Sequence, residues 1–245
     1  MTRILTILTL ATLIIPTSAS AQEFTAEQQA KIQQMFKNYL LENGEVILES
    51  VNNYQGELVE KEQANANKKA AGYVDSLSAR KDLATAGNPK GDITIVEFFD
   101  YNCGYCSRAL NEIKTVLKDD ENVKVIFMDM PILGAPSLEA SKWSLAAQNQ
   151  NKYWEYHQRI MDHKGQKDES ALEKIAKEIG LDVKKLKKDK DSEEIENRLQ
   201  QNIQEAQEMN IRGTPGFIIE GDITPGYIPA AEIKRIIGEK RKAKS

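Results

Sequence analysis

Residues 93–106 read ITIVEFFDYNCGYC, and the architecture of the main domain can be predicted from this stretch. Its first seven residues are β-branched or aromatic apart from Glu97, which is typical of a buried strand. Cys103 follows after a three-residue connection, and apolar residues then recur at helical spacing over residues 108–117. A second apolar strand pattern covers residues 123–130. We therefore expect a βαβ unit in which Cys103 lies where the first strand passes into the helix.

The chain has two cysteines, Cys103 and Cys106, and both belong to one C-x-x-C motif. A sulfur at the start of a helix faces unpaired N–H groups and the positive end of the dipole, which stabilise a thiolate. Cysteines in such motifs have pKa values of roughly 3.5–7.5, against about 8.5 for a free cysteine. We expect the Cys103 thiolate to attack a disulfide and Cys106, one turn deeper, to resolve the mixed disulfide. A bridge across so short a loop would stabilise the fold little, so the pair is predicted to be reactive rather than structural.

A metal site is the alternative interpretation of two neighbouring cysteines. Zinc prefers four ligands, commonly from two C-x-x-C pairs or from one pair and nearby histidines. His157 and His163 are the only histidines and lie far downstream, which argues against zinc. Two thiolates suffice for copper(I), so copper carriage stays open as a second activity. Disulfide exchange itself requires neither a metal nor an organic cofactor.

Glu97 is a carboxylate inside an apolar strand, where burial is unfavourable unless the group has a partner or a task. It precedes Cys103 by six residues. We expect the strand to place Glu97 behind Cys106, where its pKa is raised by burial and it can take the Cys106 proton. The alternative is a solvent-facing Glu97 on an edge strand.

Thr214-Pro215 precedes a short strand pattern at residues 217–220. A cis form is accessible to an X-Pro bond. Proline also lacks an N–H group, so a loop of this kind can leave neighbouring backbone groups free for an extended substrate chain. The dipeptide alone is weak support, because most Thr-Pro pairs form trans turns.

The N-terminus has the pattern of an export signal. Arg3 is followed by an apolar run at residues 4–15 and by the small residues Ala19-Ser20-Ala21. We expect a signal peptide over residues 1–21, cleaved before Gln22, with an uncleaved membrane anchor as the alternative. Net charge is −4, so no basic excess points to nucleic acid.

Residues 22–86 are predicted to form a helical oligomerisation segment and a linker. Two helices are expected, the first starting with a capping box at Thr25 and Gln28, and both carry an apolar stripe. We expect this stripe to be buried by self-association, with packing on the main domain as the alternative. Residues 60–79 lose most of the stripe and are expected to be a solvated helix or a mobile linker.

The main domain is predicted to span residues 87–245, with a largely helical stretch at about residues 135–209. Trp143 and Trp154 are expected in its core. For His157 a surface position or an ordinary helix position with satisfied hydrogen bonds is favoured over a ligand role, and His163 is expected in a loop.

These motifs together resemble the DsbA family. The residues that carry the resemblance are 96–106 (VEFFDYNCGYC), 213–216 (GTPG) and 131–134 (PILG), and it covers roughly Gly87 to the C-terminus. It implies an α/β chain, with a thioredoxin fold that contains an inserted helical domain and is preceded here by the N-terminal helical extension. It also implies that Cys103 attacks, Cys106 resolves, Glu97 is the buried acid and Pro215 is a cis-proline beside the disulfide.

The residues around the cysteines help to distinguish a dithiol oxidase from an isomerase or reductase. DsbA-type oxidases usually have Pro-His between the cysteines and Val before the cis-proline, whereas this chain has Gly104-Tyr105 and Thr214, similar to DsbC-type isomerases. Gly104, Tyr105, Thr214 and Pro215 are the expected substrate contacts. Without a histidine between the cysteines, the disulfide should be less oxidising. An isomerase or reductase is therefore favoured over a dithiol oxidase, and a non-enzymatic envelope chaperone is a further alternative.

The N-terminal extension resembles that of the ScsC-type branch, whose members can oligomerise. The resemblance implies a periplasmic protein that acts on unfolded or wrongly disulfide-bonded exported proteins. The implied redox partner is a membrane thiol–disulfide reductase of the DsbD or ScsB type, or a membrane oxidase of the DsbB type. A homo-oligomer formed through the N-terminal helices is expected.

Overall fold

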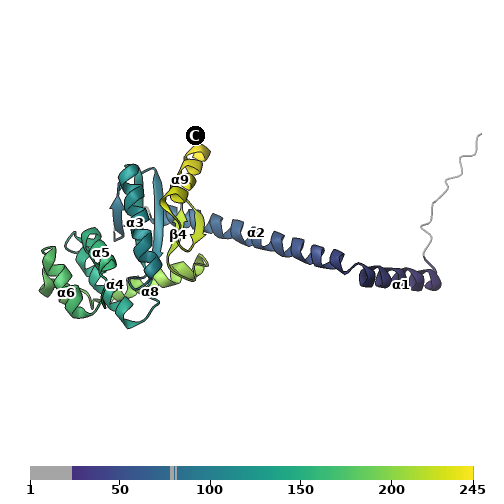
Figure 1. The fold of residues 1–245 in the computed structure, drawn as a ribbon, viewed down its shortest axis with the longest axis horizontal. Helices are drawn as coiled ribbons and strands as arrows, with labels where there is room; N and C mark the ends of the chain where they lie inside the picture. Colours follow the sequence, from purple (N-terminus) through teal and green to yellow (C-terminus); the bar gives the residue numbers. More distant parts are fainter. Residues whose placement is uncertain (1–23, 78–79, 81, 245) are drawn as a thin grey trace, which may run out of the picture. The chain divides into compact units, whose positions relative to one another are not determined.

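The structure is a computed structural model whose helices and strands are labelled in Figure 1. It describes residues 24–77, 80 and 82–244. The predicted signal peptide, residues 1–21, lies outside the described residues. The chain divides into two compact units, the first ending at Leu58 and the second beginning at Val59. In the part of the chain that is described, no helix is both long and apolar enough to cross a membrane.

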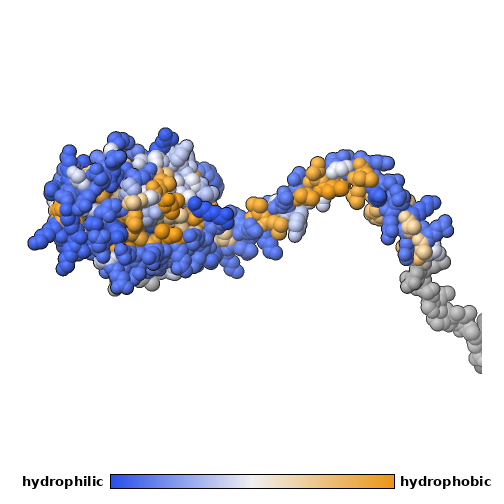
Figure 2. All heavy atoms as spheres, turned by 90° about the horizontal axis from the view of Figure 1, so that it is seen from below, coloured by the Kyte–Doolittle hydropathy of each residue, from blue (hydrophilic) through white to orange (hydrophobic). Residues whose placement is uncertain are grey.

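The N-terminal unit contains α1 (Ala26–Glu42) and the first part of α2 (Gly44–Leu77). The predicted capping box starts α1: the Thr25 hydroxyl accepts from the N–H of Gln28 at 3.2 Å, and the Gln28 side chain accepts from the N–H of Thr25 at 2.9 Å. No side chain of α1 is buried. Apolar side chains are exposed along this helical segment, which shows orange surface in Figure 2. The large ones are Phe24, Met35, Phe36, Tyr39, Leu40, Leu41, Val46, Ile47, Leu48, Val51, Tyr54 and Leu58.

A five-stranded sheet forms the centre of the second unit, with strand order β1-β3-β2-β4-β5. β2 and β3 are parallel and are joined through α3 (Gly104–Asp119), which confirms the predicted βαβ unit. All other neighbouring pairs in this sheet are antiparallel. The strands are β1 (Ala84–Gly87), β2 (Ile93–Phe99), β3 (Val123–Asp129), β4 (Gly216–Ile219) and β5 (Asp222–Pro225).

The predicted domain boundary at residue 86 is wrong, because it falls inside the edge strand β1. Residues 84–87 pair antiparallel with residues 124–127 of β3. Their sequence, Ala-Thr-Ala-Gly, carries little strand preference of its own. Pairing with a partner distant in the sequence makes this segment a strand.

The helical insertion lies between β3 and β4, close to the predicted bounds of 135–209, and α9 (Ala230–Lys244) follows the sheet. In Figure 1 these inserted helices gather on one side of the second unit. They are α4 (Ala135–Gln148), α5 (Tyr153–Asp162), α6 (Glu169–Glu178), α7 (Val183–Asp189) and α8 (Glu193–Glu208).

The side chains of β2 alternate between two apolar cores, as the two-residue period of a strand requires. Ile95 and Phe99 belong to the core that includes Cys106. Val96 and Phe98 belong to a second core on the other face of the sheet. Both faces of β2 are therefore buried, which explains its almost continuous apolar sequence.

The end of α2 packs on this second core, where the sequence analysis expects a solvated helix or a linker. Ala70, Val74 and Leu77 are buried there. The Tyr73 hydroxyl also donates to the Glu205 carboxylate at 2.6 Å. The stripe consists of few and partly small residues, so its pattern is weak in the sequence. These few residues are sufficient to hold the end of α2 on the sheet, because the sheet face opposite them is apolar and is shielded from water by the helix.

Candidate active site

Cys103 is the N-cap residue of α3, directly after the connection from β2. Its side chain is partly exposed, whereas Cys106, one turn into the helix, is buried. Cys103 Sγ lies 3.3 Å from the carbonyl oxygen of Thr214, to which the protonated thiol donates a hydrogen bond. The Thr214–Pro215 bond is cis. The fold thus joins the C-x-x-C motif to Thr214, which is 111 residues away in the sequence.

The two thiols have opposite electrostatic surroundings. A hydrogen bond from the Cys106 thiol is the largest influence on Cys103 and lowers its pKa to about 5; burial opposes this, and the backbone N–H groups of Tyr105 and Cys106 add to it. Burial raises the pKa of Cys106 far above its usual range, and the hydrogen bond to Cys103 and the charge of Glu97 act in the same direction. At neutral pH the site therefore holds one thiolate, at Cys103, and one thiol, at Cys106.

Glu97 is buried in β2, with an exposed fraction of 2%. Because β2 lies between β3 and β4, the alternative of a solvent-facing Glu97 on an edge strand is wrong. Strand alternation places Glu97 on the same face as Ile95 and Phe99, toward the core that contains Cys106. Burial, and then the charge of Cys103, raise the pKa of Glu97 to about 8. Within the described residues its carboxyl makes no hydrogen bond.

Asp100 holds the cysteine loop in place, a role that was not predicted from the sequence. Its buried carboxylate accepts from the backbone N–H groups of Asn102 (2.7 Å), Ile132 (2.8 Å) and Leu133 (2.9 Å) and from the Ser137 hydroxyl (2.7 Å). It thereby ties the active-site loop to the start of the helical insertion. The available signal is an acidic residue directly after a buried strand, where Asp commonly bonds the N–H two residues on.

The surface beside Cys103 is open and partly aromatic. Apart from Gly104 itself, its two chain neighbours and the adjacent backbone of α3, no atom lies within 4 Å of the position that a Cβ on Gly104 would take. Tyr105 is 57% exposed, and its ring centroid lies 6.4 Å from that of Tyr227. The guanidinium carbon of Arg108 lies 5.2 Å from the centroid of the Tyr105 ring. The surface next to Cys103 therefore combines open space at Gly104 with exposed aromatic rings.

The histidines do not enter the site. His157 is buried, its Nδ1 lies 2.9 Å from the Tyr101 hydroxyl, and burial lowers its pKa to about 3. This confirms the expectation of a satisfied helix residue. Trp143 is fully buried, Trp154 packs against the core and His163 follows the end of α5. No group of three or more His, Cys, Asp or Glu side chains that could hold a metal ion occurs in the described residues.

Comparison with known proteins places this geometry among related folds. The family described as "DSBA-like thioredoxin domain" matches residues 94–238. A thioredoxin-like oxidoreductase from Silicibacter pomeroyi DSS-3 is 37% identical, with a TM-score of 0.66, over 69% of this chain and 97% of that chain. The thiol-disulfide exchange protein alpha-DsbA2 from Wolbachia pipientis is 27% identical, with a TM-score of 0.68, over 73% of this chain and 97% of that chain.

The structure of Proteus mirabilis ScsC in a transitional conformation is similar to a larger share of this chain than the two structures above. It covers 91% of this chain and 98% of that chain at 25% identity, with a TM-score of 0.64. Among curated proteins, the Na(+)/H(+) antiporter NhaA 1 of Mycobacterium sp. (strain KMS) is 27% identical over 158 residues, which is 62% of this chain. The match spans 25% of that antiporter's length.

Proposed function

The chain belongs to the family of DsbA-like thioredoxin domains, and on this basis we propose that it is a periplasmic protein thiol–disulfide oxidoreductase that works mainly as an isomerase or reductase. The observation that carries the proposal is the position of Cys103. It caps α3 with a pKa of about 5, and its sulfur lies 3.3 Å from Thr214 O at the cis-proline. The periplasmic location is inferred from the predicted signal peptide.

Each step is a thiol–disulfide exchange. The Cys103 thiolate attacks one sulfur of a substrate disulfide, the substrate S–S bond breaks, and the other substrate sulfur leaves as a thiolate. In isomerisation a different substrate thiolate attacks the substrate sulfur of the mixed disulfide, so a new substrate disulfide forms and Cys103 leaves as a thiolate, with no net oxidation. In reduction Cys106 gives up its proton and attacks the Cys103 sulfur. A Cys103–Cys106 disulfide then forms and the substrate leaves with both of its sulfurs reduced.

Glu97 is proposed to take the proton that Cys106 must lose. The charge of the Cys103 thiolate is one of the two causes that raise the pKa of Glu97. This charge disappears when Cys103 enters the mixed disulfide, so Glu97 then ionises more readily. The carboxylate becomes available at the step in which Cys106 needs a base.

The isomerase assignment rests on the surroundings of Cys103. No cationic side chain stands between the cysteines, where Gly104 and Tyr105 are found. The pKa of about 5 for Cys103 lies between about 3.5 for the strong oxidase DsbA and about 7 for thioredoxin. The open space at Gly104 and the exposed Tyr105 ring support contact with a protein substrate. We propose a membrane reductase of the DsbD or ScsB type as the partner that keeps the pair reduced, with a DsbB-type oxidase as the alternative partner.

Refolding of scrambled ribonuclease, measured beside oxidation of reduced ribonuclease, tests this proposal. We expect the protein to restore ribonuclease activity from the scrambled form and Cys103→Ala to restore none. Activity on the reduced form alone would indicate a dithiol oxidase. No activity in either assay, with aggregation still suppressed by Cys103→Ala, would indicate a chaperone.

We further propose that the segment from residue 24 to Leu58 joins copies of this chain. Its exposed apolar side chains far exceed the scattered exposure usual for a monomer. Light scattering should give a multiple of the chain mass for the protein, and a single chain mass for a variant that begins at Val59. This cut keeps Ala70, Val74 and Leu77, which belong to the core of the second unit. A single chain mass for both proteins would refute the proposal.

A further inference from the structure

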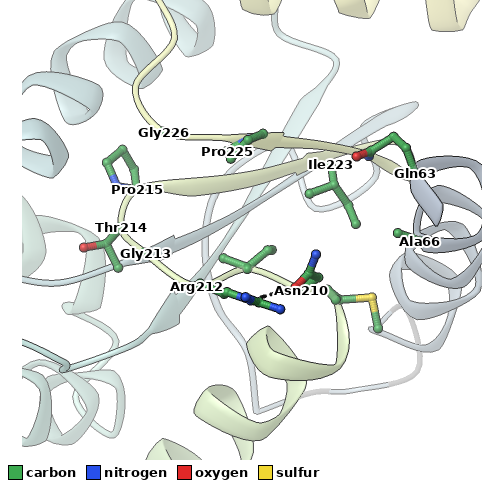
Figure 3. A pocket seen from close by; sticks show the side chains of 12 residues that line it. Gln63, Ala66, Asn210, Arg212, Gly213, Thr214, Pro215, Ile223, Pro225 and Gly226 are labelled. Atoms are coloured by element: carbon green, nitrogen blue, oxygen red, sulfur yellow. Dashed lines mark hydrogen bonds between the residues drawn. The ribbon is translucent and has the colours of Figure 1, made fainter. Parts of the chain in front are cut away.

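A groove of about 260 Å³ lies between α2 and the loop that contains the cis-proline Pro215 (Figure 3). One wall is α2, which contributes Gln63 and Ala66, and the loop from Met209 to Pro215 forms another. We propose that the part of α2 from Val59 to Leu77 forms a wall of the substrate site. It would bind an extended segment of the substrate polypeptide next to the substrate cysteine that Cys103 attacks. This inference rests on the proposed function and adds a subsite to it.

The loop side of the groove has free hydrogen-bonding groups. Within the described residues, the backbone N–H and C=O groups of Arg212 and Gly213 and the N–H of Thr214 make no hydrogen bond. Both Arg212 and Gly213 are exposed. Such a free backbone edge pairs with an extended peptide by strand addition. The edge ends at Thr214 O, 3.3 Å from Cys103 Sγ, so a segment bound along it would pass the reactive sulfur.

The α2 side of the groove is held firmly against the sheet. The Asn67 side-chain oxygen accepts from the backbone N–H of Ile223 in the edge strand β5 at 3.2 Å and from the Gln63 side chain at 2.9 Å. One turn further on, Ala70 is completely buried. Ala66, directly before Asn67, is half-buried and lines the groove. Its methyl group leaves room that a larger side chain would occupy.

The lining also indicates which peptides fit. Arg212 is the one charged residue among those that line the groove in the described structure, and Met209, Ile211 and Ile223 supply apolar surface. The Arg212 side chain donates to the Asn210 side chain at 2.9 Å and remains exposed. The groove therefore suits neutral or acidic extended segments better than basic ones.

Ala66→Trp and Ala64→Trp form a matched pair for testing the wall. Ala64 lies on the same helix, is exposed and does not line the groove, so both changes carry the same helix-propensity effect. With a short peptide disulfide as substrate, Ala66→Trp should raise KM at least about tenfold, as loss of a subsite does, with kcat little changed. Reduction of cystamine should stay at the wild-type rate, because it needs the Cys103 thiolate and no groove. Ala64→Trp should match wild type on both substrates.

An unchanged KM for the peptide in Ala66→Trp would overturn the inference. An equal loss of activity on the peptide and on cystamine would also overturn it, because the substitution would then affect the Cys103 thiolate and not the groove. If Ala66→Trp does not fold, Ala66→Leu, with a smaller side chain and strong helix propensity, serves with the same expected direction. Wild-type protein that is inactive on both substrates would instead contradict the proposed function and the inference with it.

Discussion

Cys103 should titrate with a midpoint near pH 5 when its thiolate absorbance or its alkylation rate is followed against pH. At pH 7 it is then almost fully ionised, with about thirty times the thiolate fraction of an ordinary cysteine thiol of pKa about 8.5. Cys106 should resist alkylation over the same range, because burial keeps it protonated. We therefore expect one thiol per chain, Cys103, to be alkylated rapidly.

Cys106→Ala is the informative control. It removes the hydrogen bond that lowers the Cys103 pKa most, so the midpoint should rise while Cys103 stays reactive. The variant should also accumulate mixed disulfides with substrate, because no resolving thiol is left. A wild-type midpoint close to 9, or one that Cys106→Ala leaves in place, would refute the proposed activation of Cys103.

Glu97→Gln should stabilise the fold and slow the reaction. In the folded protein the Glu97 carboxyl keeps its proton up to a pH of about 8, whereas the unfolded chain releases it near the ordinary value of 4.5. Between these values folding takes up a proton, so this group makes the wild-type protein less stable as pH rises. Removing it should raise the free energy of unfolding at pH 7 by about 3 kcal/mol.

The difference in unfolding free energy between Glu97→Gln and wild type should be small near pH 4.5 and should reach a plateau above pH 8. Urea unfolding across this range measures it. Asp129, whose pKa burial raises to about 7, titrates in the same window but is present in both proteins. Cys103 also titrates there, and because its charge is one of the causes of the Glu97 shift, its coupling to Glu97 is part of the measured difference. Glu121→Gln, at an exposed site, should change nothing. A flat difference across the window would show that Glu97 titrates normally.

The activity of Glu97→Gln separates the two cysteine steps. The amide cannot accept a proton, so resolution by Cys106 should slow by about a hundredfold, the usual size of a general-base contribution. Attack by Cys103 should be little affected, and the mixed disulfide should accumulate during turnover. Equal slowing of both steps would assign Glu97 a structural role.

Local sequence patterns were sufficient to predict the β2–α3–β3 unit that carries the two cysteines. The apolar run of β2, the helical spacing that starts at Cys103 and the apolar run of β3 all arise from neighbouring residues, so each could be recognised in the sequence. The role of Asp100 could not, because its four partners include Ile132, Leu133 and Ser137, more than thirty residues on. Likewise, β1 and the buried end of α2 exist through partners that a local pattern does not contain.

The sequence was therefore enough to establish a strand–cysteine–helix unit and an apolar N-terminal segment, because periodicity and helix-start chemistry act over a few residues. The three-dimensional fold was needed to bring Thr214 to 3.3 Å from Cys103 and to bury Glu97 between two neighbouring strands. It was equally needed to set Ala66 beside the cis-proline loop. Each of these contacts joins residues far apart in the sequence, which a local pattern does not contain. In the folded chain burial raises the pKa values of Glu97 and Cys106, whereas hydrogen bonds lower that of Cys103.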